Sequence, residues 1–269
     1  MRRHYLMCRP THFAVDYAIN PWMDPAEPVD VARAIDQWTR LVGTYRDLGH
    51  DVDFIEPLPG LPDMVFTANG ATVIDGTVLG VSFKHAERAA EGPAFLDWFT
   101  RAGFPTQAAK ATNEGEGDLL LAGDMILAGT GFRTDHAAHA EVQELFGRPV
   151  VTLQLVDPRF YHLDTALCVL HPTPGSGRPE IAYLPEAFSP GSRRVLERLY
   201  PTAIKATARD AAVLGLNAVS DGERVVLPVQ ASDLARRLAS EGYEPVGVDM
   251  SELRRAGGGP KCCTLEVRR

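Results

Sequence analysis

The chain has 269 residues, of which 45% are hydrophobic and 23% are charged, and its formal net charge is −8. This length and composition are typical of a globular protein with a sizeable core. The negative balance and the lack of a lysine- or arginine-rich run argue against nucleic acid or an anionic membrane as the main partner, whereas a cationic small molecule would be attracted.

The lack of a recognisable targeting signal and the cysteine usage point to a reducing compartment. The basic start is followed by too short an apolar stretch for a signal peptide, and no run of roughly 18 apolar residues is present. The four cysteines are Cys8, Cys168, Cys262 and Cys263. None forms a Cys-x-x-Cys pair, so we expect reduced thiols and a cytoplasmic protein.

Apolar residues at helical spacing predict five amphipathic helices. These cover residues 28–48, 85–102, 136–146, 189–200 and 232–241. Short β-like runs accompany them, such as 71–74 with 78–81 and 119–121 with 125–128. The dipeptides between such runs favour tight hairpin turns: Asp75-Gly76, Gly123-Asp124 and Asp221-Gly222. The sequence therefore predicts a hairpin-and-helix unit that is used several times.

The predicted units recur at intervals of about 45 to 55 residues, which indicates a structural repeat. One polar or thiol-bearing site recurs in each unit at about the same spacing: Thr67-Ala68-Asn69, Gly117-Asp118, Leu163-Asp164, Leu216-Asn217 and Cys262. We therefore expect a radial α/β arrangement of five units in a single domain, 1–269, with these sites meeting at its axis. The fifth unit would be closed by pairing strand 265–267 with strand 5–9. A doubly wound parallel sheet is the alternative, but it requires single strands between helices.

No linker stands out along the chain. The glycines and prolines at 172–179 predict a long hairpin loop and not a domain boundary.

The stretch 257–264 carries two thiols behind three glycines and a proline, just before the strand-like run 265–267. Such a turn can set a nucleophile at the mouth of a site, although an ordinary turn with buried cysteines is the alternative. A thiolate also needs a base and a proton donor. His162, between Tyr161 and Leu163, is a candidate for both tasks, and a structural histidine is the alternative.

Acidic residues head several of the predicted strands, where a carboxylate is costly unless a cation or several donors meet it. They are Asp63, Glu114, Glu116, Asp118 and Asp164. A guanidinium group meets this need, because its planar fork of N–H donors matches carboxylates two at a time. Each acid alone could be a turn residue, but five at repeated positions favour a shared substrate pocket.

Five motifs together resemble those of the guanidine-modifying superfamily, whose members are also called penteins. They are Asp63-Met64-Val65-Phe66-Thr67-Ala68-Asn69, Glu114-Gly115-Glu116-Gly117-Asp118, Arg133-Thr134, His162-Leu163-Asp164-Thr165 and Gly258-Gly259-Pro260-Lys261-Cys262. They stand in family order over nearly the whole chain, and its layout is most similar to dimethylarginine dimethylaminohydrolase-like proteins. The resemblance implies a five-bladed α/β propeller of hairpin-and-helix repeats with pseudo-fivefold symmetry, the site at its axis, and no metal or organic cofactor.

The resemblance also implies roles for individual residues. Cys262 corresponds to the nucleophile, with Cys263 only its neighbour, and His162 to the general acid and base. Glu114 corresponds to the carboxylate that polarises the substrate and orients the histidine, and Glu116 is the second candidate for that role. The remaining residues implied in substrate binding are Asp63 and Asp164 for the guanidinium, Asn69, and Arg133 for the α-carboxylate with Lys84 or Arg88 assisting.

The implied reaction is cysteine-dependent hydrolysis of a guanidinium C–N bond in arginine or methylated arginine through a covalent thiouronium intermediate. Asn69 replaces an acid of the citrulline-forming members, which suits a methylated guanidinium, whereas Asp164 adds an acid, which suits free arginine. We expect dimethylarginine to be converted to citrulline and dimethylamine. An arginine dihydrolase or deiminase, which forms ornithine or citrulline plus ammonia, is the close alternative, and parts of two motifs are similar to succinylarginine dihydrolase.

Three further alternatives stay open. One is an amidinotransferase, in which an amine replaces water, and another is a non-catalytic propeller that binds a partner, which would leave the thiol and the histidine unexplained. The third is a metal site at His136 and His139, which share a helix face but lack a third ligand, so a solvated helix face is preferred. A homodimer is left open as the assembly.

Overall fold

The structure is a computed structural model that describes residues 2–171, 177–178 and 180–269. Most of the glycine- and proline-rich loop predicted at 172–179 therefore lies outside the described residues. Among the helices of the described residues, none combines the length and the hydropathy that a membrane span requires.

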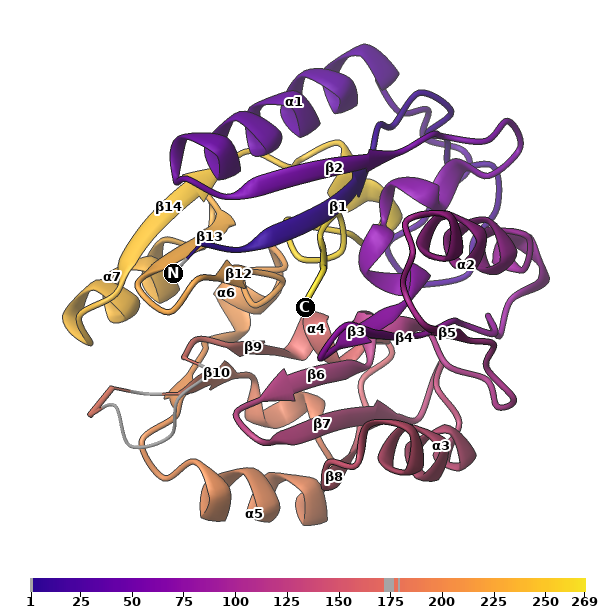
Figure 1. Cartoon of the computed structure of the whole chain (residues 1–269). Helices are drawn as coiled ribbons and strands as arrows, with labels where there is room; N and C mark the ends of the chain where they lie inside the picture. The colour runs from indigo at the N-terminus through magenta and orange to yellow at the C-terminus, as the bar shows by residue number, and fades with distance from the viewer. Residues whose placement is uncertain (1, 172–176, 179) are drawn as a thin grey trace.

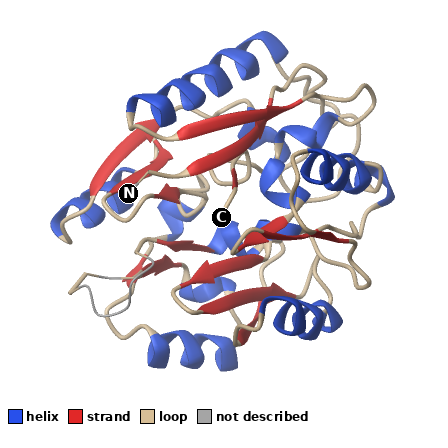
Figure 2. Ribbon diagram, viewed as in Figure 1, coloured by secondary structure: helices blue, strands red, loops and turns tan. Residues whose placement is uncertain are grey.

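Five sheets of three strands are arranged around a common centre, and a longer helix lies on the outside of each (Figures 1 and 2). In each sheet an antiparallel pair is followed by a helix and then by a third strand, parallel to the second. Four units are continuous in sequence. The first consists of β3 (Thr72–Ile74), β4 (Thr77–Leu79), α2 (Glu91–Arg101) and β5 (Thr106–Gln107), and the second of β6 (Leu119–Ala122), β7 (Met125–Thr130), α3 (His136–Phe146) and β8 (Val150–Gln154). The third consists of β9 (Leu167–Val169), β10 (Ile181–Tyr183), α5 (Pro190–Leu199) and β11 (Ile204–Lys205), and the fourth of β12 (Val219–Ser220), β13 (Arg224–Pro228), α7 (Ser232–Ser240) and β14 (Glu244–Val248).

The fifth sheet joins the two ends of the chain. Strand β15 (Leu265–Glu266) pairs antiparallel with β1 (His4–Cys8), which continues through α1 (Val31–Asp47) to β2 (Asp51–Ile55). Tyr5 faces Glu266 and Leu6 faces Leu265 across this pair. The predicted closure of the fifth unit is confirmed, and so is the radial arrangement of five units.

The sequence predicted hairpins and helices but not the third strand of each unit. These strands lie at the edge of their sheets, so one side has no β partner, and some are very short. In β2, for example, only Ile55 is buried, which leaves little of the apolar alternation that identifies a strand.

The predicted turns and helices lie close to their expected positions. Asp75 and Gly76 have φ angles of 50° and 72°, as a two-residue hairpin turn requires. Helix α3 has the predicted bounds, and α1 begins behind Asp30, whose side chain accepts the N–H of Arg33. Helix α2 was wrongly predicted to begin at residue 85. A separate 3₁₀ turn, Ala86–Arg88, precedes it, and Arg88 forms a buried ion pair with Glu91 of the helix.

Short helical turns carry the chain to the centre before the first strand of a unit. They include η1 (Pro62–Val65), η2 (Thr67–Gly70), η4 (Gly115–Gly117), α4 (Leu163–Ala166), α6 (Ala208–Ala211) and η6 (Leu253–Ala256). Apolar side chains pack between these inner segments, the sheets and the outer helices, as Phe95 and Phe99 of α2 do with Val73 and Val78. The centre is thus lined by loop ends held in place by five separate sheets.

Candidate active site

Hydrogen bonds link the inner segments of adjacent units into a ring. Asn69 Nδ2 donates to the carbonyl of Glu114, and the Glu114 side chain meets His162. Asn217 Nδ2 contacts both the carbonyl of Asp164 and the sulfur of Cys262. The backbone N–H of Ala68 closes the ring, 3.0 Å from the carbonyl oxygen of Cys262. The remaining sequence site adjoins this ring, because Asp118 accepts the backbone N–H of Leu163, so the five sites meet as predicted.

The loop that presents Cys262 depends on close approaches that only glycine allows. Gly257 has a φ of +85°, and a Cβ at Gly258 would overlap the ring of Phe66. The Cys262 side chain lies among the polar residues of the ring, and the residue is 2% exposed. Cys263 is fully buried, and both thiols border the same apolar cluster.

His162 and Glu114 form a buried pair in which Nε2 of the imidazole lies 2.7 Å from Oε2 of the carboxylate. The same oxygen accepts a 2.9 Å hydrogen bond from Nη1 of Arg133. Burial by itself would raise the pKa of Glu114, but the hydrogen bond and charge of His162 and the charge of Arg133 hold that pKa well below its ordinary value. The other ring nitrogen of His162, Nδ1, has no hydrogen-bond partner among the described residues.

Two buried aspartates keep one carboxylate oxygen without a donor among the described residues. Asp63 accepts from the hydroxyl of Tyr17 at 2.8 Å through Oδ2, and its Oδ1 has no partner. In Asp164, Oδ2 lies 3.5 Å from the Cys262 sulfur and Oδ1 has no partner. Burial raises the pKa of Asp63 and raises that of Asp164 to about 6. Buried acceptors without donors are costly unless a ligand supplies the donors, so these positions suit a cation with several N–H groups.

Arg133 and Lys84 lie beside the Glu114 carboxylate. Arg133 donates through Nη2 to the carbonyl of Ile19 and stacks on the ring of Tyr161, 4.6 Å from its centroid. Lys84 is exposed, and its ammonium donates to the carbonyl of Phe132 while its backbone N–H meets Glu114.

Arg88 is enclosed, and its guanidinium is already bound within the protein. It makes two hydrogen bonds to Glu91, of 2.9 and 2.8 Å, and one of 2.8 Å to Oδ1 of Asn69. A further contact reaches the carbonyl of Asp63. Arg88 therefore holds Asn69 and the backbone beside it.

The contacts of Glu116 and Asp118 also lie within the protein. The Glu116 carboxylate is bound by Lys261 at 2.7 Å, by Arg268 and by the backbone N–H of Glu266. Asp118 accepts the backbone N–H groups of Leu163 and Thr134. Both acids join neighbouring units, and the expectation that all five carboxylates line one pocket stays a prediction.

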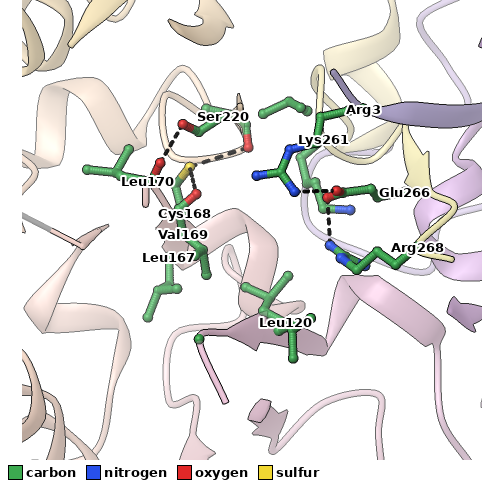
Figure 3. A pocket seen from close by; sticks show the side chains of 14 residues that line it. Arg3, Leu120, Leu167, Cys168, Val169, Leu170, Ser220, Lys261, Glu266 and Arg268 are labelled. Atoms are coloured by element: carbon green, nitrogen blue, oxygen red, sulfur yellow. Dashed lines mark hydrogen bonds and ion pairs between the residues drawn. The ribbon is translucent and has the colours of Figure 1, made fainter. Parts of the chain in front are cut away.

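A cavity of about 120 Å³ lies beside the basic residues that bind Glu116 and Glu266 (Figure 3). Arg3, Lys261 and Arg268 gather on one wall around Glu266, and Cys168 lies on the other. Its lining includes neither Cys262 nor His162 nor Glu114, so it is separate from the cluster around the thiol.

The prediction of a solvated helix face at His136 and His139 is wrong for His139. This side chain faces the sheet, where Nδ1 lies 2.8 Å from the hydroxyl of Thr152 and Nε2 lies 3.2 Å from the carbonyl of Gly129. Across the described ranges of the chain, no group of three histidine, cysteine, aspartate or glutamate side chains is arranged to hold a metal ion.

The sequence did not single out the segment between β1 and α1, which covers the site. Tyr17 bonds Asp63, Ile19 bonds Arg133, Asn20 bonds the carbonyl of Ala256, and the indole of Trp22 donates to the carbonyl of Arg159. The segment has no regular structure and no chemical motif, so its place over the site follows only from these tertiary contacts.

The chain is similar to several characterised proteins in sequence. The model of the eukaryotic N,N dimethylarginine dimethylhydrolase family matches residues 7–171. The N(G),N(G)-dimethylarginine dimethylaminohydrolase of Mycobacterium tuberculosis is 53% identical over 265 residues, which span 98% of this chain and 86% of that protein. The bifunctional arginine dihydrolase/ornithine cyclodeaminase ArgZ of Synechocystis is 37% identical over 97% of this chain, which spans only 37% of that relative.

Solved structures agree with the five-unit fold. The N-terminal domain of ArgZ, as a cysteine-to-serine variant bound to substrate, superposes with a TM-score of 0.93 at 35% identity and covers 99% of this chain and 98% of its own. A dimethylarginine dimethylaminohydrolase with an S-methyl-L-thiocitrulline adduct has a TM-score of 0.83 at 20% identity over 99% of this chain, which concerns the fold alone. The match of the family model and the 53% identity over almost the whole chain show that this protein is a member of the dimethylarginine dimethylaminohydrolase family of hydrolases.

Proposed function

We propose that the protein hydrolyses the guanidinium C–N bond of Nω-methylated arginine and converts dimethylarginine to citrulline and dimethylamine. The observation that carries this proposal is the buried cluster in which the Cys262 sulfur lies 3.5 Å from Asp164, within the ring that holds the His162–Glu114 pair. A nucleophile, acceptors for a guanidinium and a proton carrier are thereby gathered in one place. The 53% identity to the hydrolase of Mycobacterium tuberculosis supports the choice of substrate.

Substrate binding would use the two aspartates with free acceptor oxygens. The N–H groups of a guanidinium would bond Oδ1 of Asp63 and of Asp164, which have no donor among the described residues. The cation then lies beside the thiol and favours its ionised form. In this proposal Arg133, with Lys84 nearby, would hold the α-carboxylate of the amino acid.

The first half of the reaction forms a covalent intermediate. The Cys262 thiolate attacks the guanidinium carbon and forms a C–S bond. His162, as imidazolium, gives a proton to the departing dimethylamine as the C–N bond breaks, and a thiouronium remains on the sulfur.

The second half regenerates the enzyme. The neutral imidazole accepts a proton from water, whose oxygen attacks the same carbon. The C–S bond then breaks and the remaining hydroxyl proton is lost to solvent, which returns the thiolate and leaves the ureido group of citrulline. Glu114 would keep the ring of His162 in place and stabilise its charged form in both halves.

Arginine dihydrolysis to ornithine is the second candidate function. It is favoured by Asn69, an amide that Arg88 and the carbonyl of Glu114 hold where the citrulline-forming pattern has an acid. The fit to the ArgZ domain, with a TM-score of 0.93, supports the same alternative.

Product analysis separates the two. The purified protein is incubated separately with asymmetric dimethylarginine, arginine and succinylarginine, and citrulline, ornithine and released amines are resolved by mass spectrometry. Citrulline and dimethylamine from the methylated substrate are expected, and none from the Cys262→Ser variant. Ornithine from arginine, with no dimethylamine from the methylated substrate, would contradict the first choice and support the second.

Location and assembly belong to the same proposal. We infer a cytoplasmic protein, because the structure contains four free cysteines, as a reducing compartment allows. A homodimer stays a prediction, and light scattering of the purified protein tests it.

A further inference from the structure

Asn217 is the side chain in closest polar contact with the proposed nucleophile. It is fully buried, and its Nδ2 lies 3.0 Å from the Cys262 sulfur and 3.2 Å from the carbonyl oxygen of Asp164. Its Oδ1 accepts the backbone N–H groups of Gly259, at 3.0 Å, and of Cys262, at 2.9 Å. One amide group therefore contacts both ends of the loop that carries the thiol and the thiol itself.

The orientation of this amide follows from its neighbours. Two backbone N–H groups point at one end, and only an oxygen can accept them both. The NH₂ group must then face the sulfur and the carbonyl of Asp164. A turned amide would place donors against donors at one end and two acceptors at the other, so Asn217 acts as the donor in its contact with sulfur.

The backbone on both sides is built for this close approach. A Cβ at Gly259 would lie 2.9 Å from Oδ1 of Asn217, which is closer than a side chain tolerates. On the other side, the N–H of Asn217 is bonded to the carbonyl of Leu214, which itself has a φ of 55°. Asn217 is thus fixed by its own turn and touches a loop position without a side chain.

The surroundings of the sulfur otherwise oppose a negative charge. Asp164, Cys263 and Tyr161 are the titratable groups around it, and Asp164 lies 3.5 Å away. The charges of His162 and Lys261 act on that carboxylate in turn. Burial and then the charge of Asp164 raise the pKa of Cys262, while hydrogen bonds from the Gly259 backbone and from Asn217 oppose that rise.

We propose that Asn217 is a positioning residue for the reaction, which fixes the Cys262 loop through its oxygen and stabilises the Cys262 thiolate through its N–H donor. The inference rests on the proposed function only in taking Cys262 as the nucleophile. A hydrogen bond to the charged form of a thiol favours that form, so Asn217 should increase the fraction of enzyme that is ready to attack.

The test uses Asn217→Asp and Asn217→Ala. The aspartate has the same shape and keeps the oxygen that accepts both backbone N–H groups, so this variant should fold, but it loses the donor and adds a negative charge. The alanine removes both functions. Asp210→Asn is the matched control, because Asp210 is buried in the preceding turn, where it binds the N–H of Leu234 and its carbonyl accepts from Gly215, but it does not contact the thiol.

Ionisation of the thiol is measured directly. For each protein, the ultraviolet absorbance of the thiolate is titrated and corrected with the corresponding Cys262→Ser protein, and the rate of alkylation by iodoacetamide is followed against pH. We expect the midpoint to move up by at least about one pH unit in Asn217→Ala and further in Asn217→Asp. Turnover should fall about 10²-fold, with a smaller change in KM. Asp210→Asn should lower Tm and leave the midpoint in place.

Two outcomes would overturn the inference: a wild-type midpoint in folded Asn217→Asp, or an equal shift in Asp210→Asn. The titration does not depend on substrate. If the midpoint shifts as expected while no methylated arginine is hydrolysed, the proposed function fails and the role of Asn217 stands. If methylated arginine is hydrolysed while the midpoint does not move, the proposed function stands and the role of Asn217 fails.

Discussion

Nη1 of Arg133 lies 2.9 Å from Oε2 of Glu114, so a guanidinium of the protein itself rests on the carboxylate that is proposed to serve the reaction. Both side chains are buried. The same carboxylate oxygen binds His162. Arg133 is therefore the proposed clamp for the substrate carboxylate and also balances the buried charge of Glu114.

Arg133→Ala should weaken substrate binding and folding together. The proposed contact with the substrate α-carboxylate by itself predicts a large rise in KM. The ion pair changes this expectation, because removing one partner of a buried pair leaves an unpaired charge, at a cost of about 3 to 5 kcal/mol. Steady-state kinetics and urea unfolding measure both effects. Arg148→Ala, which breaks an exposed pair with Asp75, is the control and should change neither by much.

Cys262→Ser should abolish turnover, whereas Cys263→Ala should retain most of it. The two thiols are neighbours in sequence and both border the apolar core, but of the two only Cys262 has a hydrogen-bond contact with Asn217 and Asp164. Loss of a buried sulfur should lower the stability of Cys263→Ala by about 1 kcal/mol or more. A haloacetamidine probe followed by peptide mass mapping locates the reactive thiol. Labelling of Cys263 with Cys262 spared would contradict the assignment.

Glu114→Gln should mainly lower kcat, whereas Glu116→Gln should mainly lower Tm. Glu114 holds His162, so its amide variant should lose about 10²-fold or more in kcat. The Glu116 carboxylate is bound by Lys261 and Arg268, so its amide variant should lower Tm while the folded fraction stays active. Thermal unfolding is measured alongside kcat for both. A normal kcat in Glu114→Gln would exclude that residue as the orienting acid.

His162→Ala should lower kcat by about 10² to 10⁴-fold, since both proton transfers are assigned to one ring. The rate of the wild-type enzyme should follow a bell-shaped profile that belongs to the coupled groups of the site. Rates are measured over roughly pH 5 to 10. A flat profile, or an unchanged rate in the variant, would refute the role.

Asp164 should make both stability and binding depend on pH. Its pKa is raised to about 6 by burial, so the folded state holds this proton more tightly than the unfolded chain does. Its contribution to stability is therefore present at low pH and is lost as pH rises from about 4 through 6. Asp164→Asn, which stays neutral, should raise Tm relative to wild type at pH 8 and have little effect at pH 4.

Binding should change in the opposite direction, because only the ionised carboxylate attracts a guanidinium. In the Cys262→Ser background, affinity for the methylated substrate should rise as pH increases through about 6, the pKa of Asp164. Calorimetry against pH measures this rise. An equal rise in the double variant with Asp164→Asn would assign it to another group.

The repeat of the fold could be predicted from sequence because it leaves a strong local signal. Turn dipeptides such as Asp75-Gly76 and amphipathic patterns such as that of α3 each depend on a few neighbouring residues. The edge strands were missed because their pairing is to a strand on the far side of a helix, and β11 has only two residues in which to show a pattern. The repeat spacing also predicts that the five inner sites lie together.

The residue types of the candidate site could be predicted from the sequence, but their hydrogen-bond and ion-pair partners could not. Cys262, His162, Glu114, Asp63 and Asp164 all lie in the central cluster. Sequence gave no means to tell that Arg88 is saturated by Glu91, or that Glu116 is bound by Lys261, because each outcome depends on where a flexible side chain ends. In the sequence, Asn217 stands out only as a member of the repeat. Its contact with the thiol depends on Gly259 reaching it from a distant part of the chain.

The pairing of β1 with β15 has a consequence for how the molecule folds. Arg3 and Glu266, which form an ion pair across this sheet, are 263 positions apart. Contacts between such distant parts of a chain carry a large loop-closure entropy and are intrinsically slow to form. Four of the sheets consist of neighbouring segments and can form locally, but the fifth forms only when the two ends of the chain come together. The Cys262 loop leads directly into β15, so recovery of activity during refolding should lag behind recovery of helical circular dichroism.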